Sequence, residues 1–226
     1  MTDADVVDAP LRALVQAIAV GAVARALNML RDSPALATAS FKTGASRRTA
    51  NAYLLDGIGR YLYEGDTALH IAAASYQREI VRKLIAMGAD VRARNRRGAE
   101  PLHAAAVGMP GSPRWNPRAQ AATVACLIEA NADPNATDKN GATPLHRAVR
   151  TRCATAVRAL LQGGADARRK NKSGTAPMRL ASLNTGRGGT GSPEAKSQQQ
   201  EILRLLRERG ATGKRSSQMA RPTPRK

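Results

Sequence analysis

A repeated motif is the feature that most limits what this sequence can fold into. The stretches GDTALHIAA, GAEPLHAAA and GATPLHRAV begin at positions 65, 98 and 141, and GTAPMRLAS begins at 174. The first and last of these intervals are both 33 residues, and an insertion in the second copy accounts for the longer middle interval. A second series (GAD, NAD, GAD, GAT) keeps the same phase at 88, 131, 164 and 210. A chain with such a period stacks small units that mainly contact their neighbours.

Each unit carries the signals of two helices. Thr143 can cap a helix N-terminus, and Pro144 suits the first helical position because its missing N–H would be unpaired there. Second helices are predicted over 78–87, 121–130 and 154–163. Gly88 and Gly164 are expected to end two of these helices in the left-handed conformation. Asn131 can end the other helix in the same way, although asparagine adopts this conformation less often than glycine. The segments that follow, ADVRARNRRG, ADPNATDKNG and ADARRKNKSG, are expected to be extended hairpin fingers.

The chain resembles the ankyrin-repeat family over residues 65–211, because the motif T-P-L-H-x-A, its period and its phase coincide there. The resemblance implies an all-α solenoid of helix-turn-helix units joined by β-hairpin fingers. It also implies a non-catalytic module that binds other proteins, and we expect a stand-alone, bacterial member of the family. Aromatic residues make up only 3% of the chain, and a core of small aliphatic side chains suits packed helices better than a β-sandwich.

The phase of the repeat divides the chain into segments. In order, we expect a flexible N-terminus (1–10), a capping helix pair with a long finger or insert (11–64), a first repeat (65–97), a second repeat with a loop insertion at 108–118 (98–140), a third repeat (141–173), a C-terminal capping repeat with a Gly/Ser-rich insertion at 184–199 (174–212), and a basic disordered tail (213–226).

The motif places His70, His103 and His146 at the same position of successive repeats. Three histidines can bind zinc. However, neighbouring units of a helical stack stand about 10 Å apart, which exceeds the reach of shared coordination. In the ankyrin family this histidine is structural and ties neighbouring hairpins and helices together through hydrogen bonds. We therefore expect neither a metal site nor a cofactor.

Three segments depart from the repeat. Residues 38–64 hold four of the six aromatic residues, and we interpret them as an elongated finger with a short helix near 48–56 that packs on the first repeat, with a specificity loop as the alternative. Residues 108–118 contain Trp115, which either folds back onto the outer helices or anchors a partner. Residues 184–199 are expected to be flexible, and their GRGGTG stretch lacks the spacing and the preceding strand of a phosphate-binding loop.

The net charge of +19 indicates an acidic partner. In ankyrin proteins the finger tips and the exposed positions of the inner helices form the concave binding face. Carrying those positions over to this chain predicts a basic face, with a plain solvated surface as the alternative. The predicted partner-binding residues are Arg94, Arg96, Arg97, Lys139, Arg147, Arg150, Lys170 and Lys172, with Trp115 as a candidate anchor.

Three functions compete on this evidence. The leading interpretation is a module that binds an acidic protein through the basic face. The alternative is nucleic-acid or anionic-surface binding, which the charge favours, although the chain has few aromatics for base stacking and no known nucleic-acid motif. An enzyme would need Cys153 as its nucleophile. Neighbouring arginines could lower the pKa of Cys153, but the repeat phase places no general base beside it.

Two cysteines are too few for a disulfide scaffold and predict a reducing compartment. The acidic stretch MTDADVVDAP lacks the basic region of a secretory signal, and the most apolar stretch, 13–24, is too short to cross a bilayer. We therefore expect a cytoplasmic monomer that does not enter membranes.

Overall fold

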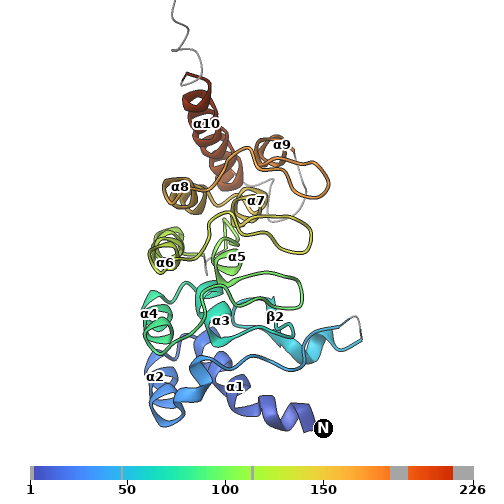
Figure 1. The fold of residues 1–226 in the computed structure, drawn as a ribbon, viewed down its shortest axis with the longest axis vertical. Helices are drawn as coiled ribbons and strands as arrows, with labels where there is room; N and C mark the ends of the chain where they lie inside the picture. The colour runs from blue at the N-terminus through green and yellow to red at the C-terminus, as the bar shows by residue number, and fades with distance from the viewer. Residues whose placement is uncertain (1–2, 47, 113–114, 184–192, 216–226) are drawn as a thin grey trace, which may run out of the picture.

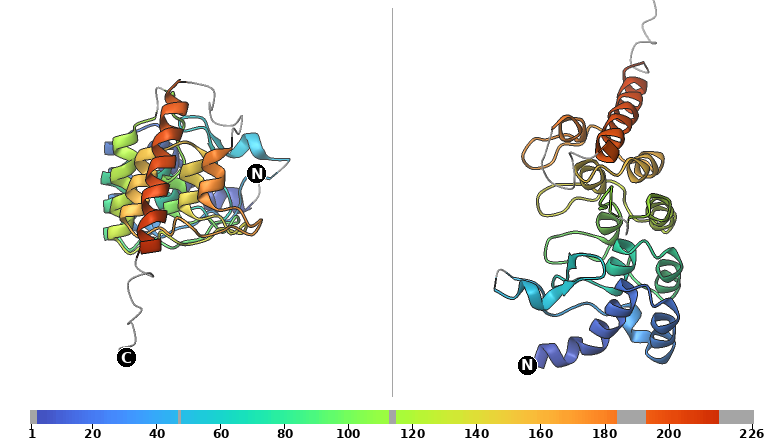
Figure 2. Two further views of the ribbon diagram at one scale, coloured as in Figure 1. Left: turned by 90° about the horizontal axis from the view of Figure 1, so that it is seen from above. Right: turned by 180° about the vertical axis from the view of Figure 1, so that it is seen from behind.

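The computed structural model describes residues 3–46, 48–112, 115–183 and 193–215. The helices form two parallel columns, and the fingers form a third column beside them (Figure 1). The inner column contains α1, α3, α5, α7 and α9, and the outer column contains α2, α4, α6, α8 and α10 (Figure 2). The predicted fold class, an all-α repeat solenoid, is confirmed.

The helix bounds follow the repeat. The first pair is α1 (Asp3–Ala19) and α2 (Val23–Asp32), which turns at Gly21 with φ of 79° and is followed by the 3-10 helix η1 (Pro34–Ala37). The later pairs are α3 (Ala68–Ala74) with α4 (Arg78–Ala86), α5 (Pro101–Ala105) with α6 (Pro117–Glu129), α7 (Pro144–Arg150) with α8 (Ala154–Gln162), and α9 (Pro177–Ser182) with α10 (Pro193–Arg215).

Local sequence explains where these helices begin and end. The side chains of Thr67 and Thr143 accept hydrogen bonds from the backbone N–H groups three residues on, so they cap α3 and α7. Beyond the outer helices, Gly88, Asn131 and Gly164 all take positive φ values, as the sequence predicts. The core consists largely of alanine and leucine, and the small alanines let neighbouring helices approach closely.

Each finger ends in a tight turn, and the fingers contain no assigned strand. In the first finger, the backbone N–H of Asn95 donates to the carbonyl of Ala99 at 3.1 Å. Within the described ranges, the one sheet is a short antiparallel pair in the 38–64 insertion, β1 (Leu54–Leu55) and β2 (Arg60–Tyr61), in which Leu54 pairs with Tyr61.

The structure corrects several predicted boundaries. Residues 3–10, expected to be flexible, form the start of α1, and a buried carboxylate at Asp8 holds them to the insertion. The short helix expected near 48–56 is a single 3-10 turn, η2 (Ala50–Tyr53), because the chain continues directly into β1.

Two more corrections concern the C-terminal unit. Residues 193–199 belong to α10 and not to a flexible insertion, because Ile202, Leu205 and Leu206 bury one face of this long helix against α8 and α9. Residues 213–215, assigned to the tail, complete α10. The rest of that insertion (184–192) and of the tail (216–226) lie outside the described residues.

Candidate protein-binding cleft

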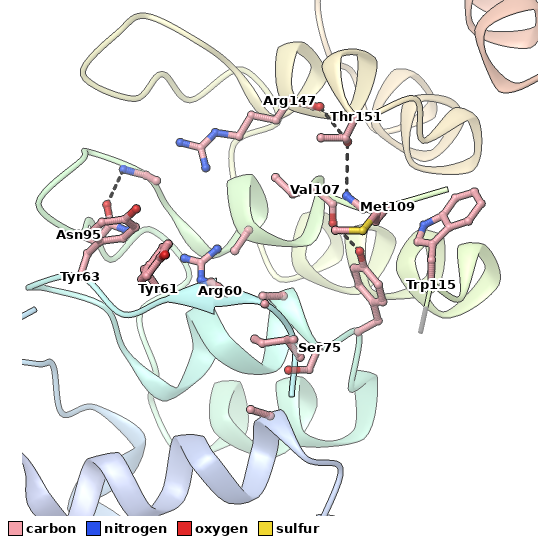
Figure 3. Close-up of a pocket in the computed structure, with 18 of the residues that line it drawn as sticks. Arg60, Tyr61, Tyr63, Ser75, Asn95, Val107, Met109, Trp115, Arg147 and Thr151 are labelled. Atoms are coloured by element: carbon pink, nitrogen blue, oxygen red, sulfur yellow. Dashed lines mark hydrogen bonds between the residues drawn. The ribbon is translucent and has the colours of Figure 1, made fainter. Parts of the chain in front are cut away.

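A cleft of about 850 Å³ lies between the fingers and the inner helices. Its floor comes from successive inner helices α3, α5 and α7. Its two walls come from segments that depart from the repeat, namely the β1–β2 hairpin and the loop between α5 and α6 (Figure 3). A concave site of this size is typical of ligand binding.

Buried polar contacts hold the hairpin wall against the N-terminal helices. The Asp8 carboxylate of α1 accepts hydrogen bonds from the backbone N–H groups of Lys42 and Thr43 at 3.1 and 3.2 Å, and from the Thr43 hydroxyl at 3.1 Å. A Cβ atom at Gly57 would lie 2.8 Å from the carbonyl oxygen of Ala19. The hairpin turn therefore sits directly on the end of α1 and closes the cleft on that side.

The opposite wall is the loop between α5 and α6. The hydroxyl of Tyr76 donates to the carbonyl of Val107 and so ties this loop to the preceding repeat. The indole N–H of Trp115 donates to the side-chain oxygen of Gln120 at 2.9 Å, and the half-buried ring packs against the core. Trp115 thus folds back onto the molecule as one of the two interpretations predicted, while it also lines the cleft.

Gly108 sets the position of this wall. A Cβ atom there would lie 2.6 Å from the sulfur of Cys153 and 2.7 Å from the indole nitrogen of Trp115. We expect Gly108→Val to displace the indole, to shift the emission of this single tryptophan to longer wavelength, and to lower the unfolding free energy by about 1–2 kcal/mol. Gly210→Ala, placed where a new Cβ meets open space, is the control and should leave the emission unchanged. Unchanged emission in Gly108→Val would contradict this packing.

Four arginines and one carboxylate line the cleft within the described residues. Arg147 is only 18% exposed and pairs with Asp138 at 2.8 Å, so its charge is already neutralised. Arg60 is 17% exposed and lies 3.5 Å from the buried carboxylate of Asp66. Arg150, at the end of α7, is exposed and makes no ion pair with any described residue. The cleft therefore presents a surplus of positive charge.

The cleft is also the main apolar surface of the described residues. Five large hydrophobic side chains are exposed among the described residues. Four of these five line the cleft, namely Val20, Tyr61, Val107 and Met109. Large exposed apolar side chains are individually common, but a group of them in one concave site indicates an interaction surface.

The predicted partner-binding residues divide between two places. Four of them line the cleft: Arg97, Arg147, Arg150 and Trp115. The other five lie on the fingers outside the cleft: Arg94, Arg96, Lys139, Lys170 and Lys172. Arg94 forms an ion pair with Glu100 at 3.0 Å. The Arg96 and Arg97 guanidinium groups lie over the Tyr63 ring, 5.8 and 5.3 Å from its centroid. These arginines are therefore partly engaged within the molecule.

Arg96, Lys139 and Lys172 occupy equivalent positions on three successive fingers. The backbone N–H of each donates to a carbonyl of the finger or insertion before it, at 2.7 to 3.0 Å. A Cβ at Gly98 would lie 3.2 Å from Cγ of Lys139, and one at Gly141 would lie 3.0 Å from Cγ of Lys172. Each lysine stem therefore lies over the glycine of the preceding finger. We call these three residues the basic finger column.

The three motif histidines connect successive repeats. Nδ1 of each ring accepts a backbone N–H at 3.2 Å from the residue that caps its own helix. Nε2 lies 3.0 to 3.1 Å from a carbonyl of the next repeat, at Ala99, Ala142 and Thr175 respectively. Because a carbonyl only accepts, Nε2 carries the proton, and both ring nitrogens are occupied. No group of three His, Cys, Asp or Glu residues in the described ranges could hold a metal ion.

Burial governs the ionisation of these histidines and of the cysteines. It lowers the pKa of His70 and His146, and that of His103 to about 3. Burial also raises the pKa of the Cys153 thiol to about 11. The sequence-based suggestion that nearby arginines could lower the pKa of Cys153 is therefore wrong, because desolvation dominates.

Sequence reasoning missed most of the apolar part of the cleft. Val20, Val107 and Met109 lie at the end of a helix or in a loop, where hydrophobic periodicity carries no information. In the sequence, Tyr61 is distinguished only as one of the four aromatic residues of the 38–64 insertion. The clustering of Val107, Met109 and Trp115 in one segment that breaks the repeat was the available signal.

Comparison with protein families agrees with this geometry. A model of three ankyrin repeats matches residues 36–112, and a model of many ankyrin repeats matches residues 127–181. No functionally curated protein matches the chain significantly. No described helix is both long and apolar enough to cross a membrane. Ankyrin repeats are in general protein–protein interaction modules and are typically non-catalytic. With these matches covering more than half of its residues, the chain belongs to the ankyrin-repeat family.

Proposed function

We propose that this protein is a non-catalytic interaction module that binds an acidic protein partner through its basic concave and finger face. The observation that carries the proposal is the basic finger column. Lys139 and Lys172 are exposed and form no ion pair with any described residue, and they stand at equivalent positions of adjacent fingers. A rigid stack holds these charges at fixed spacing, so little entropy is lost when carboxylates bind them.

Three features support the finer parts of this proposal. Both thiols are free and buried, as suits a cytoplasmic location. The net charge of +19 opposes self-association and favours a monomer. The aromatic rings of this region are partly covered, since the Arg96 and Arg97 guanidinium groups lie over the Tyr63 ring and the Trp115 ring packs against the core. This arrangement favours a protein over a single-stranded nucleic acid, which needs free ring faces.

Charge reversal on the basic finger column tests the proposal. We expect Lys139→Glu/Lys172→Glu to lower the retention of a specific acidic protein from native cell lysate at least tenfold, because two attractive contacts become repulsive. Retained proteins would be measured by quantitative mass spectrometry, with and without nuclease. Arg82→Glu/Lys83→Glu on the outer helix α4 is the matched control, since it changes the net charge equally on the opposite side of the stack.

Two results would contradict the proposal. If nuclease abolishes retention, the partner is nucleic acid. If both double variants lose the partner equally, the net charge and not the finger column determines binding.

A further inference from the structure

We propose that the cleft binds an extended acidic segment of the protein partner by taking one apolar side chain of that segment between its two walls, while a neighbouring carboxylate pairs with Arg150. This inference rests on the proposed function and adds an anchor to it. The basic finger column explains why an acidic partner is attracted, but it does not explain why exposed apolar side chains gather in the cleft.

The apolar group lies between walls that are specific to this chain. Val20 and Met109 are 72% and 59% exposed, and they belong to opposite walls, the end of α1 beside the hairpin turn and the loop after α5. Both walls are fixed, the first by Asp8 and the second by Tyr76. An apolar side chain that enters the cleft would find an exposed apolar group on each wall, and both walls are already held in place, so binding requires no rearrangement.

Charge identifies the kind of segment that fits. Arg150 is exposed at the rim of the cleft and has no acidic partner among the described residues. The buried Nε group of Arg60 also has no hydrogen-bond partner among the described residues. The only carboxylate in the described lining, Asp138, is bound to Arg147. An occupant therefore needs carboxylates next to its apolar side chain.

The same charge argues against the occupants that the protein itself could supply. Residues 216–226 contain three basic residues and no acidic one, so the positive cleft repels them. A second copy of a chain with a net charge of +19 is repelled as well. An acidic segment of a different protein is the occupant with complementary charge.

The test uses two synthetic peptides, each with six glutamates around a central residue that is either leucine or glycine. Binding to the full chain, up to about 1 mM peptide, would be followed by calorimetry and by the emission of Trp115 in the cleft wall. We expect the leucine peptide to bind at least tenfold more tightly, because its side chain is buried.

Variants locate the effect. Val20→Ser/Met109→Ser should abolish the preference for leucine and leave the affinity for the glycine peptide unchanged, and both side chains are exposed enough for the fold to tolerate the changes. Arg150→Gln should weaken both peptides. Leu183→Ser is the matched control, because Leu183 is 43% exposed and outside the cleft, and it should change nothing.

The outcomes separate this inference from the proposed function. Equal binding of the two peptides, with loss of both in Lys139→Glu/Lys172→Glu, would overturn the apolar anchor and retain the acidic-partner function. A leucine preference that survives in Val20→Ser/Met109→Ser would also overturn the anchor. Failure of both peptides to bind would overturn both proposals.

Discussion

Lowering the pH from 7 to 4.5 should destabilise this protein, because three buried histidines are neutral in the folded state. Burial lowers the pKa of His70, His103 and His146, whereas the unfolded chain protonates its histidines near pH 6.5. Below that pH the unfolded state binds more protons, so stability is full above pH 6.5 and is lost as the pH falls. A histidine that stays neutral in the folded state costs about 1.4 kcal/mol per pH unit below 6.5, so His103, with a pKa of about 3, costs about 3 kcal/mol by pH 4.5. The lowered pKa values of His70 and His146 add to this loss in the same direction.

Urea unfolding at half-unit pH steps, followed by circular dichroism, would measure this dependence. His103→Gln removes one titrating group, so the slope of unfolding free energy against pH should fall by about 1.4 kcal/mol per pH unit, independently of any change in unfolding free energy at pH 7. Burial raises the pKa of Glu100, which opposes the trend at the acidic end but involves a single group. A free energy that stays constant from pH 7 to 5 would show that the histidines are not buried as neutral rings.

Replacing Asp8 by alanine should destabilise the protein by about 2–4 kcal/mol, because its carboxylate accepts hydrogen bonds from three donor groups at the start of the 38–64 insertion. Asp8 is only 2% exposed, so its removal leaves backbone N–H groups of Lys42 and Thr43 without an acceptor. The hairpin wall of the cleft depends on the same contact. Hydrogen exchange should therefore increase at these amides and through the hairpin, while the repeats beyond α5 keep their protection.

Asp32→Ala is the control for this experiment. Asp32 is 68% exposed, and among the described residues its carboxylate forms an ion pair only with its neighbour Arg31, at 3.3 Å, so the change should cost less than about 0.5 kcal/mol. If Asp8→Ala behaves like Asp32→Ala, the insertion is held by other contacts, such as the hydrogen bond from the Tyr53 hydroxyl to Thr43.

The repeat units were predictable because their signals are local. Thr143 and Pro144 start α7, and Gly164 takes a positive φ just after α8, through contacts within a few residues of each position. The arrangement of the three motif histidines was predictable for a related reason, since equivalent positions in successive repeats of the sequence become equivalent positions along the stack. Residues 3–10 and 193–199 were mispredicted because composition suggested flexibility, whereas contacts with distant residues stabilise both segments as helix.

The period, the starts of the inner helices of the repeats and the location of positive charge on the fingers follow from the amino-acid sequence alone, because they depend on neighbouring residues and on simple repetition. Packing in three dimensions sets which charges remain available and where the cleft lies. Arg147 and Arg150 are three residues apart on α7, yet one is neutralised by Asp138 and the other is exposed. Val20, Tyr61 and Met109 come from separate segments and meet only when the stack forms, since packing brings together residues that no local pattern relates.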